Sequence, residues 1–276
     1  MDARAPLTAC LNGARLPREH RALPVTPADL AREAAAAVAA GADDLHLHAK
    51  DAQGRDVLDA GPLAAALDAV RAAVPGVRVG VTTGAWAASD PRARVAAVRS
   101  WTVLPDAASV NWHERGADVV AGALLERGVG VEAGLWDEAA VSTWAASAHR
   151  DRCARVLVEL PGGVDPARTR AEADALLARV AATAVGATAV GATAVGATAA
   201  GATAAVTGTG VASAALPVQL HGEATSTWTL LRHAGRLGLG ARIGLEDVLH
   251  LPDGTRAAGN GALVAAAAVE LLRGGA

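Results

Sequence analysis

The chain of 276 residues contains no phenylalanine and no tyrosine, and its only aromatic residues besides histidine are six tryptophans. A core built on large rings is therefore excluded, and small aliphatic side chains must pack at close spacing. Such a composition fits a barrel whose interior layers use branched residues and whose helices lie tightly on the sheet.

The chain also has few cysteines and no net positive charge. The two cysteines, Cys10 and Cys153, are too few for a disulfide framework, which indicates buried thiols in a reducing cytoplasm. A formal charge of −3 with a pI near 6.2 leaves no basic surface for nucleic acid. The first residues, "MDARAPLTACLNGAR", lack the long apolar run of a signal peptide, so we expect a cytoplasmic protein.

Formal charge is missing altogether from 180 to 222, where the sequence "TAVGATAVGATAVGATAAGATAA" repeats with a five-residue period. A glycine at every fifth position matches neither a strand nor a helix period. A membrane span is disfavoured, because Ala, Gly and Thr provide little driving force for insertion. We interpret 183–212 as an exposed, mobile low-complexity insertion between the sixth helix and the seventh strand.

Elsewhere, short apolar runs alternate with helical patterns. The expected strands are 6–12, 44–49, 78–83, 108–112, 129–135, 155–160, 217–221 and 241–245. The expected helices are 27–40, 62–74, 91–100, 117–127, 137–149, 166–181, 225–236 and 260–273. Thr26-Pro27 and Asp90-Pro91 are typical helix starts. Eight strand–helix units over 1–276 predict one α/β domain, a (β/α)8 TIM barrel.

Polar residues follow these strands, where barrel enzymes carry their reactive groups. They are Asn12, His46, His48, Lys50, Asp51, Thr82, Thr83, Ser109, Asn111, His113, Glu114, Glu132, Glu159, His221, Glu223, Arg242, Glu246 and Asp247. Four of the eight histidines belong to this set, which argues against random placement on surface helices.

His46 and His48 lie two positions apart, so on a strand both imidazoles share one face. The spacing alone is equally consistent with two core histidines and with two metal ligands. Catalytic zinc usually takes three protein ligands. If the barrel closes, the strand before Glu246 lies one strand from the histidines, and its carboxylate can complete a metal site.

The segment "RIGLED" places Arg242 and Asp247 beside Glu246. One interpretation is a salt-bridged corner between strand and helix. The other gives Asp247 the role of a proton acceptor, with Arg242 holding it or binding a substrate carboxylate.

The chain resembles the β-keto acid cleavage enzymes, a family that includes the 3-keto-5-aminohexanoate cleavage enzyme. The resemblance covers nearly the whole chain apart from the repeat. It rests on "LNGAR", "AGADDLHLHAKDAQG", "VGVTTG", "ASVNWHE", "VGVEAGLW", "HGE" and "RIGLEDVLHLPDG" in the family's order. Ala49 and Ala224 depart from it, since the family usually has proline and glycine there.

The resemblance implies a TIM barrel that binds a divalent metal, usually zinc, and uses acetyl-CoA to convert a β-keto acid into acetoacetate and a new acyl-CoA. It makes His46, His48 and Glu246 the metal ligands. Asp247 would be the base, held by Arg242. Relatives are commonly homo-oligomers, and a tetramer is expected.

Candidate substrate-binding residues complete the expected site. The resemblance assigns Thr82 or Thr83, together with Ser109, to substrate contacts, and strand-end positions add Asn12 and Glu132. Arg15 either meets an anionic tail of the keto acid or is a surface arginine. Lys50 and Asp51 are expected to support the strand end rather than bind metal.

Two other functions fit parts of the sequence. A metal-dependent TIM-barrel hydrolase also uses paired histidines, but it normally needs further histidine and aspartate ligands from later strands. A non-catalytic binding barrel could keep a metal for stability alone.

Overall fold

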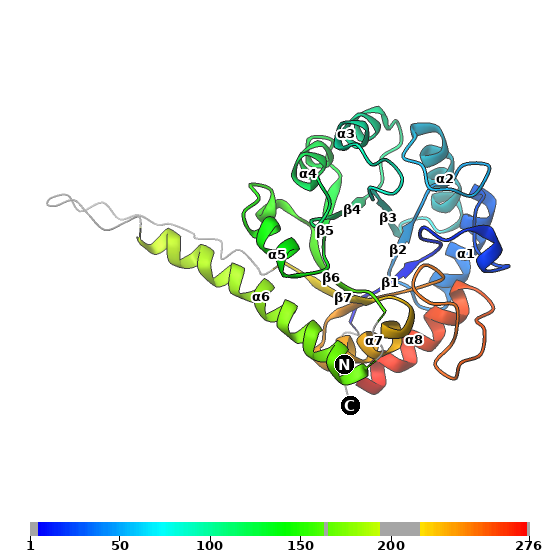
Figure 1. Ribbon diagram of the computed structural model, residues 1–276. Coiled ribbons are helices and arrows are strands. Elements are labelled where there is room, and N and C mark those ends of the chain that lie inside the picture. Colours follow the sequence, from blue (N-terminus) through cyan, green and yellow to red (C-terminus); the bar gives the residue numbers. More distant parts are fainter. Residues whose placement is uncertain (1–4, 163–164, 194–215, 275–276) are drawn as a thin grey trace, which may run out of the picture.

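Eight parallel strands alternate with helices and close into a barrel (Figure 1). The computed structural model describes residues 5–162, 165–193 and 216–274. The strands are β1 (Leu7–Cys10), β2 (Asp44–Leu47), β3 (Arg78–Thr82), β4 (Ala107–Asn111), β5 (Gly130–Leu135), β6 (Arg155–Leu160), β7 (Val218–Gly222) and β8 (Gly240–Ile243). The helices are α1 (Pro27–Ala39), α2 (Ala60–Ala73), α3 (Pro91–Ser100), α4 (Ala117–Glu126), α5 (Glu138–Ala145), α6 (Pro166–Thr193), α7 (Thr227–Leu237) and α8 (Asn260–Gly274). The predicted TIM barrel is confirmed.

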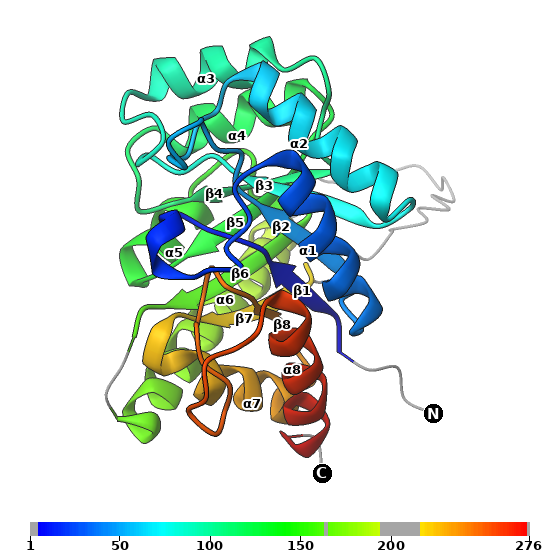
Figure 2. The same ribbon diagram turned by 90° about the vertical axis from the view of Figure 1, so that its right-hand side faces the viewer.

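Closure of the barrel joins its first and last strands. Thr8 of β1 lies opposite Asp44 of β2 on one side and Arg242 of β8 on the other. The helices close in the same way, because α8 packs beside α1 (Figures 1 and 2). The end of β8 therefore lies one strand away from β2, as the predicted metal site requires.

Two predicted helix starts are confirmed by their caps. The hydroxyl of Thr26 accepts a hydrogen bond from the backbone N–H of Asp29 before α1. The carboxylate of Asp90 accepts from the N–H of Arg92 before α3. Each cap satisfies an N–H group that has no partner within the helix, and each is followed by a proline at the first helical position.

Helix α6 is longer than the sequence pattern predicts. It continues to Thr193, so the first part of the repeat, 183–193, is helical. The high helix propensity of alanine outweighs the glycine in each repeat unit. The carboxyl-terminal part of α6 extends outward from the barrel (Figure 1), and residues 194–212 of the predicted insertion lie outside the described residues. Among the helices described, none combines the length and apolar character needed to cross a bilayer.

The main hydrophobic core lies between the sheet and the helices. Alternate strand residues such as Val79, Val81, Val156 and Val158 are buried in it. Trp101 is also buried there, and its indole N–H donates to the carbonyl of Leu58. Trp112 and Trp144 are buried in the same core, so three of the six tryptophans add bulk among the small aliphatic side chains.

The inside of the barrel is polar near the amino-terminal ends of the strands. Arg155 of β6 donates to Asp44 of β2 at 2.6 Å and pairs with Glu132 of β5 at 3.0 Å. The amide of Gln219 on β7 donates to the hydroxyl of Thr8 on β1. The Arg155–Asp44 and Gln219–Thr8 contacts join strands that are not neighbours, so they cross the interior. The expected filling by branched residues is wrong at this level, because those residues face the helices.

Candidate active site

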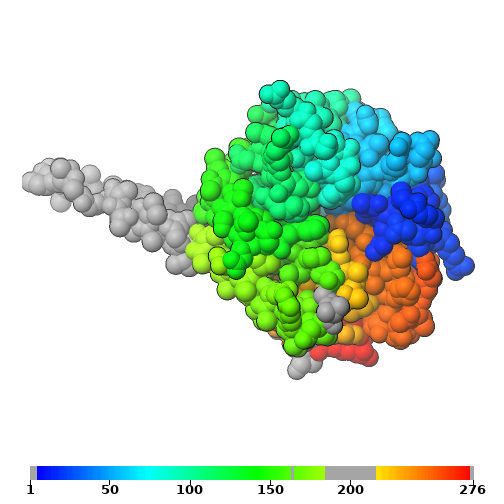
Figure 3. All heavy atoms as spheres, viewed as in Figure 1, coloured from blue at the N-terminus to red at the C-terminus, as the bar shows by residue number. Residues whose placement is uncertain are grey.

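A cavity of about 360 Å³ opens at the carboxyl-terminal ends of the strands. This is the face of a (β/α)8 barrel at which reactive residues gather. Six of the predicted site residues line the cavity: Arg15, His46, His48, Ser109, Arg242 and Glu246. The neighbouring loops are visible in the space-filling view, where the blue segment after β1 lies against the orange segment after β8 (Figure 3).

His46 and His48 meet Glu246 in this cavity. Glu246 Oε2 lies 3.9 Å from His46 Nε2 and 3.8 Å from His48 Nε2. The three residues can each offer one ligand atom to a common point. The three predicted metal ligands, from strand ends far apart in the sequence, are therefore brought together by closure of the barrel.

The three side chains suit a divalent metal. Both imidazoles are about 2% exposed, and burial holds the pKa of His46 well below its ordinary value, which favours the neutral form that binds metal. Glu246 Oε2 is buried without a hydrogen-bond partner among the described residues, and burial raises the pKa of this carboxyl. In a tetrahedral zinc site with bonds of about 2.0–2.1 Å, ligand atoms lie roughly 3.3 Å apart. The separations of 3.9 and 3.8 Å between Glu246 Oε2 and the two imidazole Nε2 atoms are close to that spacing.

The loop after β2 fixes the orientation of His48. His48 Nδ1 lies 2.6 Å from Asp56 Oδ2, so the ring donates there and turns Nε2 toward Glu246. Lys50 and the indole N–H of Trp86 also donate to Asp56, at 2.6 and 2.8 Å. Burial opposes ionisation of Asp56, but His48 and Lys50 outweigh it and lower its pKa. Lys50 is thus a supporting residue, whereas Asp51 binds Arg55 within the loop.

Two glycines allow Glu246 to reach this position. A Cβ on Gly244 would lie 1.8 Å from the carbonyl oxygen of Cys10, so only glycine permits β8 to pass this close to β1. Gly13 has a φ of +55°, and a Cβ there would lie 2.5 Å from Glu246 Cγ. Steric crowding therefore explains why "LNGAR" and "RIGLED" each contain a glycine at this position.

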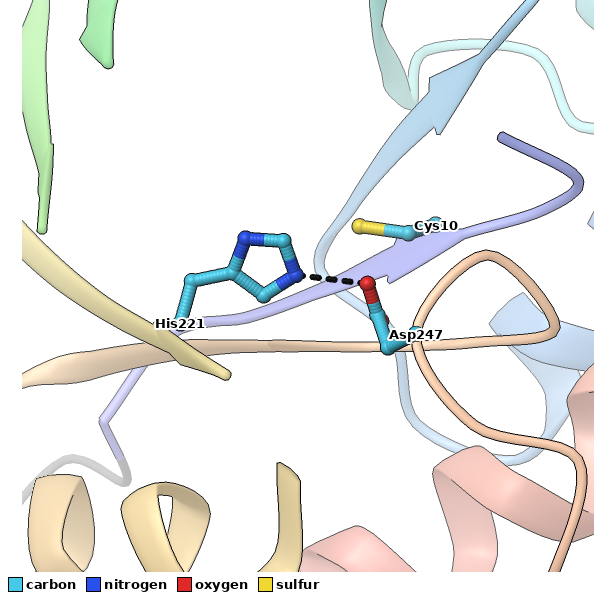
Figure 4. Close-up of side chains that lie close together, drawn as sticks. All are labelled: Cys10, His221 and Asp247. Carbon is cyan, nitrogen blue, oxygen red and sulfur yellow. Dashed lines mark hydrogen bonds and ion pairs between the residues drawn. The ribbon is translucent and has the colours of Figure 1, made fainter. Parts of the chain in front are cut away.

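Asp247 is buried next to Glu246, but its partner is not the predicted one. Asp247 Oδ1 lies 2.5 Å from Nε2 of His221, which comes from β7. Arg242 instead directs its Nε–H to Cys10 Sγ at 3.0 Å. No ion pair joins Arg242 to Asp247 within the described part of the chain. Figure 4 shows His221 pointing at Asp247, with the Cys10 thiol nearby.

Two glutamates give the cavity an acidic wall. Glu159 of β6 and Glu223, directly after β7, both line it. Burial disfavours the ionised form of Glu159, but His221 offsets this and lowers its pKa. Burial and the nearby Glu159 raise the pKa of Glu223 to about 7. Both residues stand at predicted strand ends, yet the sequence offered no role for them.

The predicted substrate-binding residues fall into two groups. Ser109 lines the cavity, whereas Thr82, Thr83, Asn12 and Glu132 are not among its lining residues. The hydroxyl of Thr83 donates to the carbonyl of Ser109, and Asn12 donates to the carbonyl of His48 and accepts from its N–H. Glu132 is paired with Arg155 inside the barrel. Their roles toward substrate stay predictions.

Arg15 lines the cavity, but its guanidinium N–H groups donate hydrogen bonds to other protein atoms. Its Nε donates to the carbonyls of Leu245 and Glu246 at 2.6 and 3.1 Å, and Nη1 pairs with Glu19. The side chain is 23% exposed. Arg15 therefore fastens the segment that carries Glu246 and Asp247.

Several cavity residues had no assigned role in the sequence. Asn111, Trp86 and Trp136 line the cavity, and the ring of Trp86 stacks on His48 with centroids 6.0 Å apart. Asn111 was a strand-end residue without a role, whereas the tryptophans lie in loops. The only feature of the sequence that could have drawn attention to these tryptophans is that aromatic residues are rare in this chain.

Solved structures with a similar fold include two complexes of ObcA. The binary complex of ObcA with oxaloacetate is 21% identical, with a TM-score of 0.62 over 92% of this chain and 64% of that chain. The ternary complex of ObcA with a C4-CoA adduct and oxalate is 20% identical, with a TM-score of 0.61 over 91% of this chain and 64% of that chain. At this identity the likeness shows the barrel fold.

Sequence comparisons identify the family. A 3-keto-5-aminohexanoate cleavage enzyme of Fusobacterium nucleatum subsp. nucleatum is 35% identical over 79 residues. That match covers 28% of this chain and 29% of the relative. The family model described as "beta-keto acid cleavage enzyme" matches residues 5–274, nearly the whole chain. The chain therefore belongs to the β-keto acid cleavage enzyme family.

Proposed function

We propose that this protein is a zinc-dependent acyltransferase that converts a β-keto acid and acetyl-CoA into acetoacetate and a new acyl-CoA. One observation carries the proposal: the ligand atoms of His46, His48 and Glu246 lie together in the cavity, whereas the carboxylate of the neighbouring Asp247 belongs to a different group, with Cys10 and His221. Ligation and proton transfer are thus supported by adjacent but separate groups.

A divalent metal held by His46, His48 and Glu246 would act as a Lewis acid on the carboxylate and keto oxygens of the substrate. Asp247, which adjoins the lining residue Glu246, would take a proton from C2 of the keto acid. It is buried, so bulk water does not surround its carboxylate group. Arg242 adds a permanent positive charge to the same cavity, where it can offset a substrate carboxylate.

The bond changes balance without an outside oxidant or reductant. Asp247 takes the C2 proton, and C2 attacks the carbonyl of acetyl-CoA and releases CoA as the thiolate. The thiolate then attacks the original keto carbon, and the bond between C2 and that carbon breaks. The products are an acyl-CoA and acetoacetate, whose C2 recovers the proton from Asp247. Ser109 and Asn111 line the cavity and can donate hydrogen bonds to the developing oxyanions.

Similar proteins support both substrate classes. ObcA has been solved with oxaloacetate, which is itself a β-keto acid, and with a CoA adduct. The family is described by the cleavage of β-keto acids. The identity of the keto acid taken by this chain, its cytoplasmic location and its assembly into a homo-oligomer stay predictions.

The test is a screen of β-keto acids with the zinc-loaded protein and acetyl-CoA. Acetoacetate and the new acyl-CoA are followed together, and oxaloacetate is included in the panel. We expect both products in equal amounts, and no cleavage when acetyl-CoA is left out.

Cleavage without any CoA thioester would contradict the proposal and favour the metal-dependent hydrolase. A protein that binds zinc but turns over no member of the panel, and whose Asp247→Asn variant behaves as the wild type in every assay, would favour the metal-stabilised binding barrel.

A further inference from the structure

His221 lies between two carboxylates below the cavity. Its Nε2 is 2.5 Å from Asp247 Oδ1, and its Nδ1 is 3.2 Å from Glu159 Oε2. The three side chains are 1%, 0% and 9% exposed. They come from the ends of β7, β8 and β6, so the line Glu159–His221–Asp247 exists only in the folded barrel.

The two carboxylates determine the charge of His221. Burial alone would favour the neutral ring, but Asp247 and Glu159 outweigh burial and hold the pKa of His221 well above its ordinary value. The ring is hydrogen-bonded to Asp247 through Nε2, whereas Nδ1 faces Glu159 as an ion pair at 3.2 Å and forms no hydrogen bond among the described residues.

The same contact leaves one oxygen of Asp247 without a partner. Oδ1 is bound to His221, whereas Oδ2 is buried with no hydrogen-bond partner among the residues described. The backbone of Asp247 is also held, because its carbonyl accepts from Ala224 N–H at 2.8 Å and its N–H donates to Gly244. Rotation of the carboxylate would break the bond to His221.

Arg242 does not provide this restraint. Its Nε–H is directed to Cys10 Sγ, on the strand next to β8 (Figure 4 shows Cys10 and Asp247). Arg242 contributes a positive charge to the cavity, whereas the side chain that orients Asp247 is His221 of β7.

We propose that His221, paired electrostatically with Glu159, is the positioning residue for Asp247, and that Asp247 Oδ2 is the atom that takes the C2 proton. This inference rests on the proposed function, because it assigns the geometry of that proton transfer. A base displaced by about 1 Å can lose roughly 100-fold in rate. His221 therefore controls turnover without contacting the substrate.

The test follows exchange of the C2 protons of acetoacetate in D2O with zinc-loaded protein and no acetyl-CoA, corrected for the uncatalysed exchange. His221→Asn removes the donor to Asp247, whereas the longer His221→Gln can place its amide nitrogen near the position of Nε2. We expect exchange to fall about 100-fold in His221→Asn and less than about 10-fold in His221→Gln, with KM for acetoacetate nearly unchanged. His233→Gln is the matched control, since His233 forms a similar 2.6 Å pair with Asp174 between α7 and α6.

A second readout needs neither zinc nor turnover. In ¹⁵N-histidine-labelled protein, the imidazole N–H proton of His221 should resonate downfield, shift in Asp247→Asn and stay unchanged in His233→Gln. If His221→Asn does not fold, the response of this resonance to Asp247→Asn tests the contact between His221 and Asp247.

The outcomes separate the two proposals. If the wild type does not exchange these protons, the proposed function fails. If the wild type exchanges them and folded His221→Asn does so equally fast, or if the His221 resonance does not respond to Asp247→Asn, the positioning role is wrong.

Discussion

Adjacent residues at the end of β8 have side chains that point to different neighbours, which is the basis for proposing different roles for them. Glu246 turns toward the imidazoles of β2, whereas Asp247 turns toward His221 of β7. One carboxylate thus faces two imidazoles that could share a cation with it, and the other is bound to His221 by a hydrogen bond. At the residue scale, position in the loop matters more than residue type.

This division can be tested with two substitutions. His48→Ala removes a ligand and should abolish bound zinc. Asp247→Asn should keep zinc and lower turnover by about 10²–10⁴-fold, as expected for loss of a general base. Metal content and acetoacetate formation are measured on the same preparations. If both variants lose metal equally, the roles of Glu246 and Asp247 have been divided wrongly.

Ala224 is strained at the end of β7. Its φ of +50° lies in the left-handed region, where a side chain costs about 1–2 kcal/mol and glycine is free of that cost. Because glycine also loses more entropy on folding, Ala224→Gly should raise the free energy of unfolding by about 0.5–1 kcal/mol, measured by urea denaturation. Gly238→Ala, at φ +67° with open space around it, is the opposite control and should lower it by about 1 kcal/mol. A lower stability of Ala224→Gly would contradict this account.

At the scale of elements, the site depends on three loops that hold one another. The loop after β1 supplies Gly13 and Arg15, which pack against and bind the segment after β8. The loop after β2 supplies Lys50, which donates to the carbonyls of Gly13 and Arg15. Removing one of these contacts should loosen the proposed metal site, although none of these groups is a proposed metal ligand.

Arg15→Met tests the tie between β1 and β8. The variant keeps much of the apolar stem but loses the bonds to the carbonyls of Leu245 and Glu246, so zinc affinity should fall about 10-fold or more. Arg18→Met, on the exposed surface of the same loop, should leave it unchanged. Zinc binding is measured by competition with a chelating dye. If Arg15→Met binds zinc normally but loses only keto acids with an anionic tail, the substrate role expected from the sequence is correct instead.

Asp56→Asn tests the loop after β2. An amide accepts the bond from His48 less strongly than a carboxylate and does not pair with Lys50, so zinc affinity should fall by about 10–100-fold. Asp51→Asn changes an aspartate of the same loop that binds Arg55 and should have no effect. The same dye competition measures both variants. Equal affinity in Asp56→Asn and wild type would show that Asp56 does not orient the ligand.

At the scale of the whole molecule, a bound metal would link β2 to the end of β8 across β1. A ligand that binds only the folded state stabilises it by about 2.7 kcal/mol when its free concentration is 100 times its Kd. Removing zinc with a chelator should therefore lower the melting temperature by several degrees, as measured by calorimetry. Added zinc should restore it, and His48→Ala should not respond. A melting temperature independent of zinc would argue against a site between these strands.

Some features were predictable because they depend on local sequence. The helix starts at Thr26 and Asp90 and the strand ends at His46 and Glu246 follow from capping and periodicity. The end of α6 was not predictable in this way. The alanines of the repeat favour a helix more than its glycines oppose one, so the helix continues to Thr193. The partner of Asp247 was also missed, since Arg242 is near in sequence whereas His221 is near only in space.

The amino-acid sequence by itself determined the alternation of eight strands and helices, the polar residues at their ends and the family, because these depend on periodicity and short motifs. Only the tertiary structure decided which of those polar groups meet. Closure of the barrel brings Glu246 to the two histidines at the end of β2, and the register of β6 and β7 sets His221 opposite Glu159 while its other ring nitrogen meets Asp247. Contacts between distant segments depend on register and on side-chain direction, and neither is encoded in the spacing of residues along the chain.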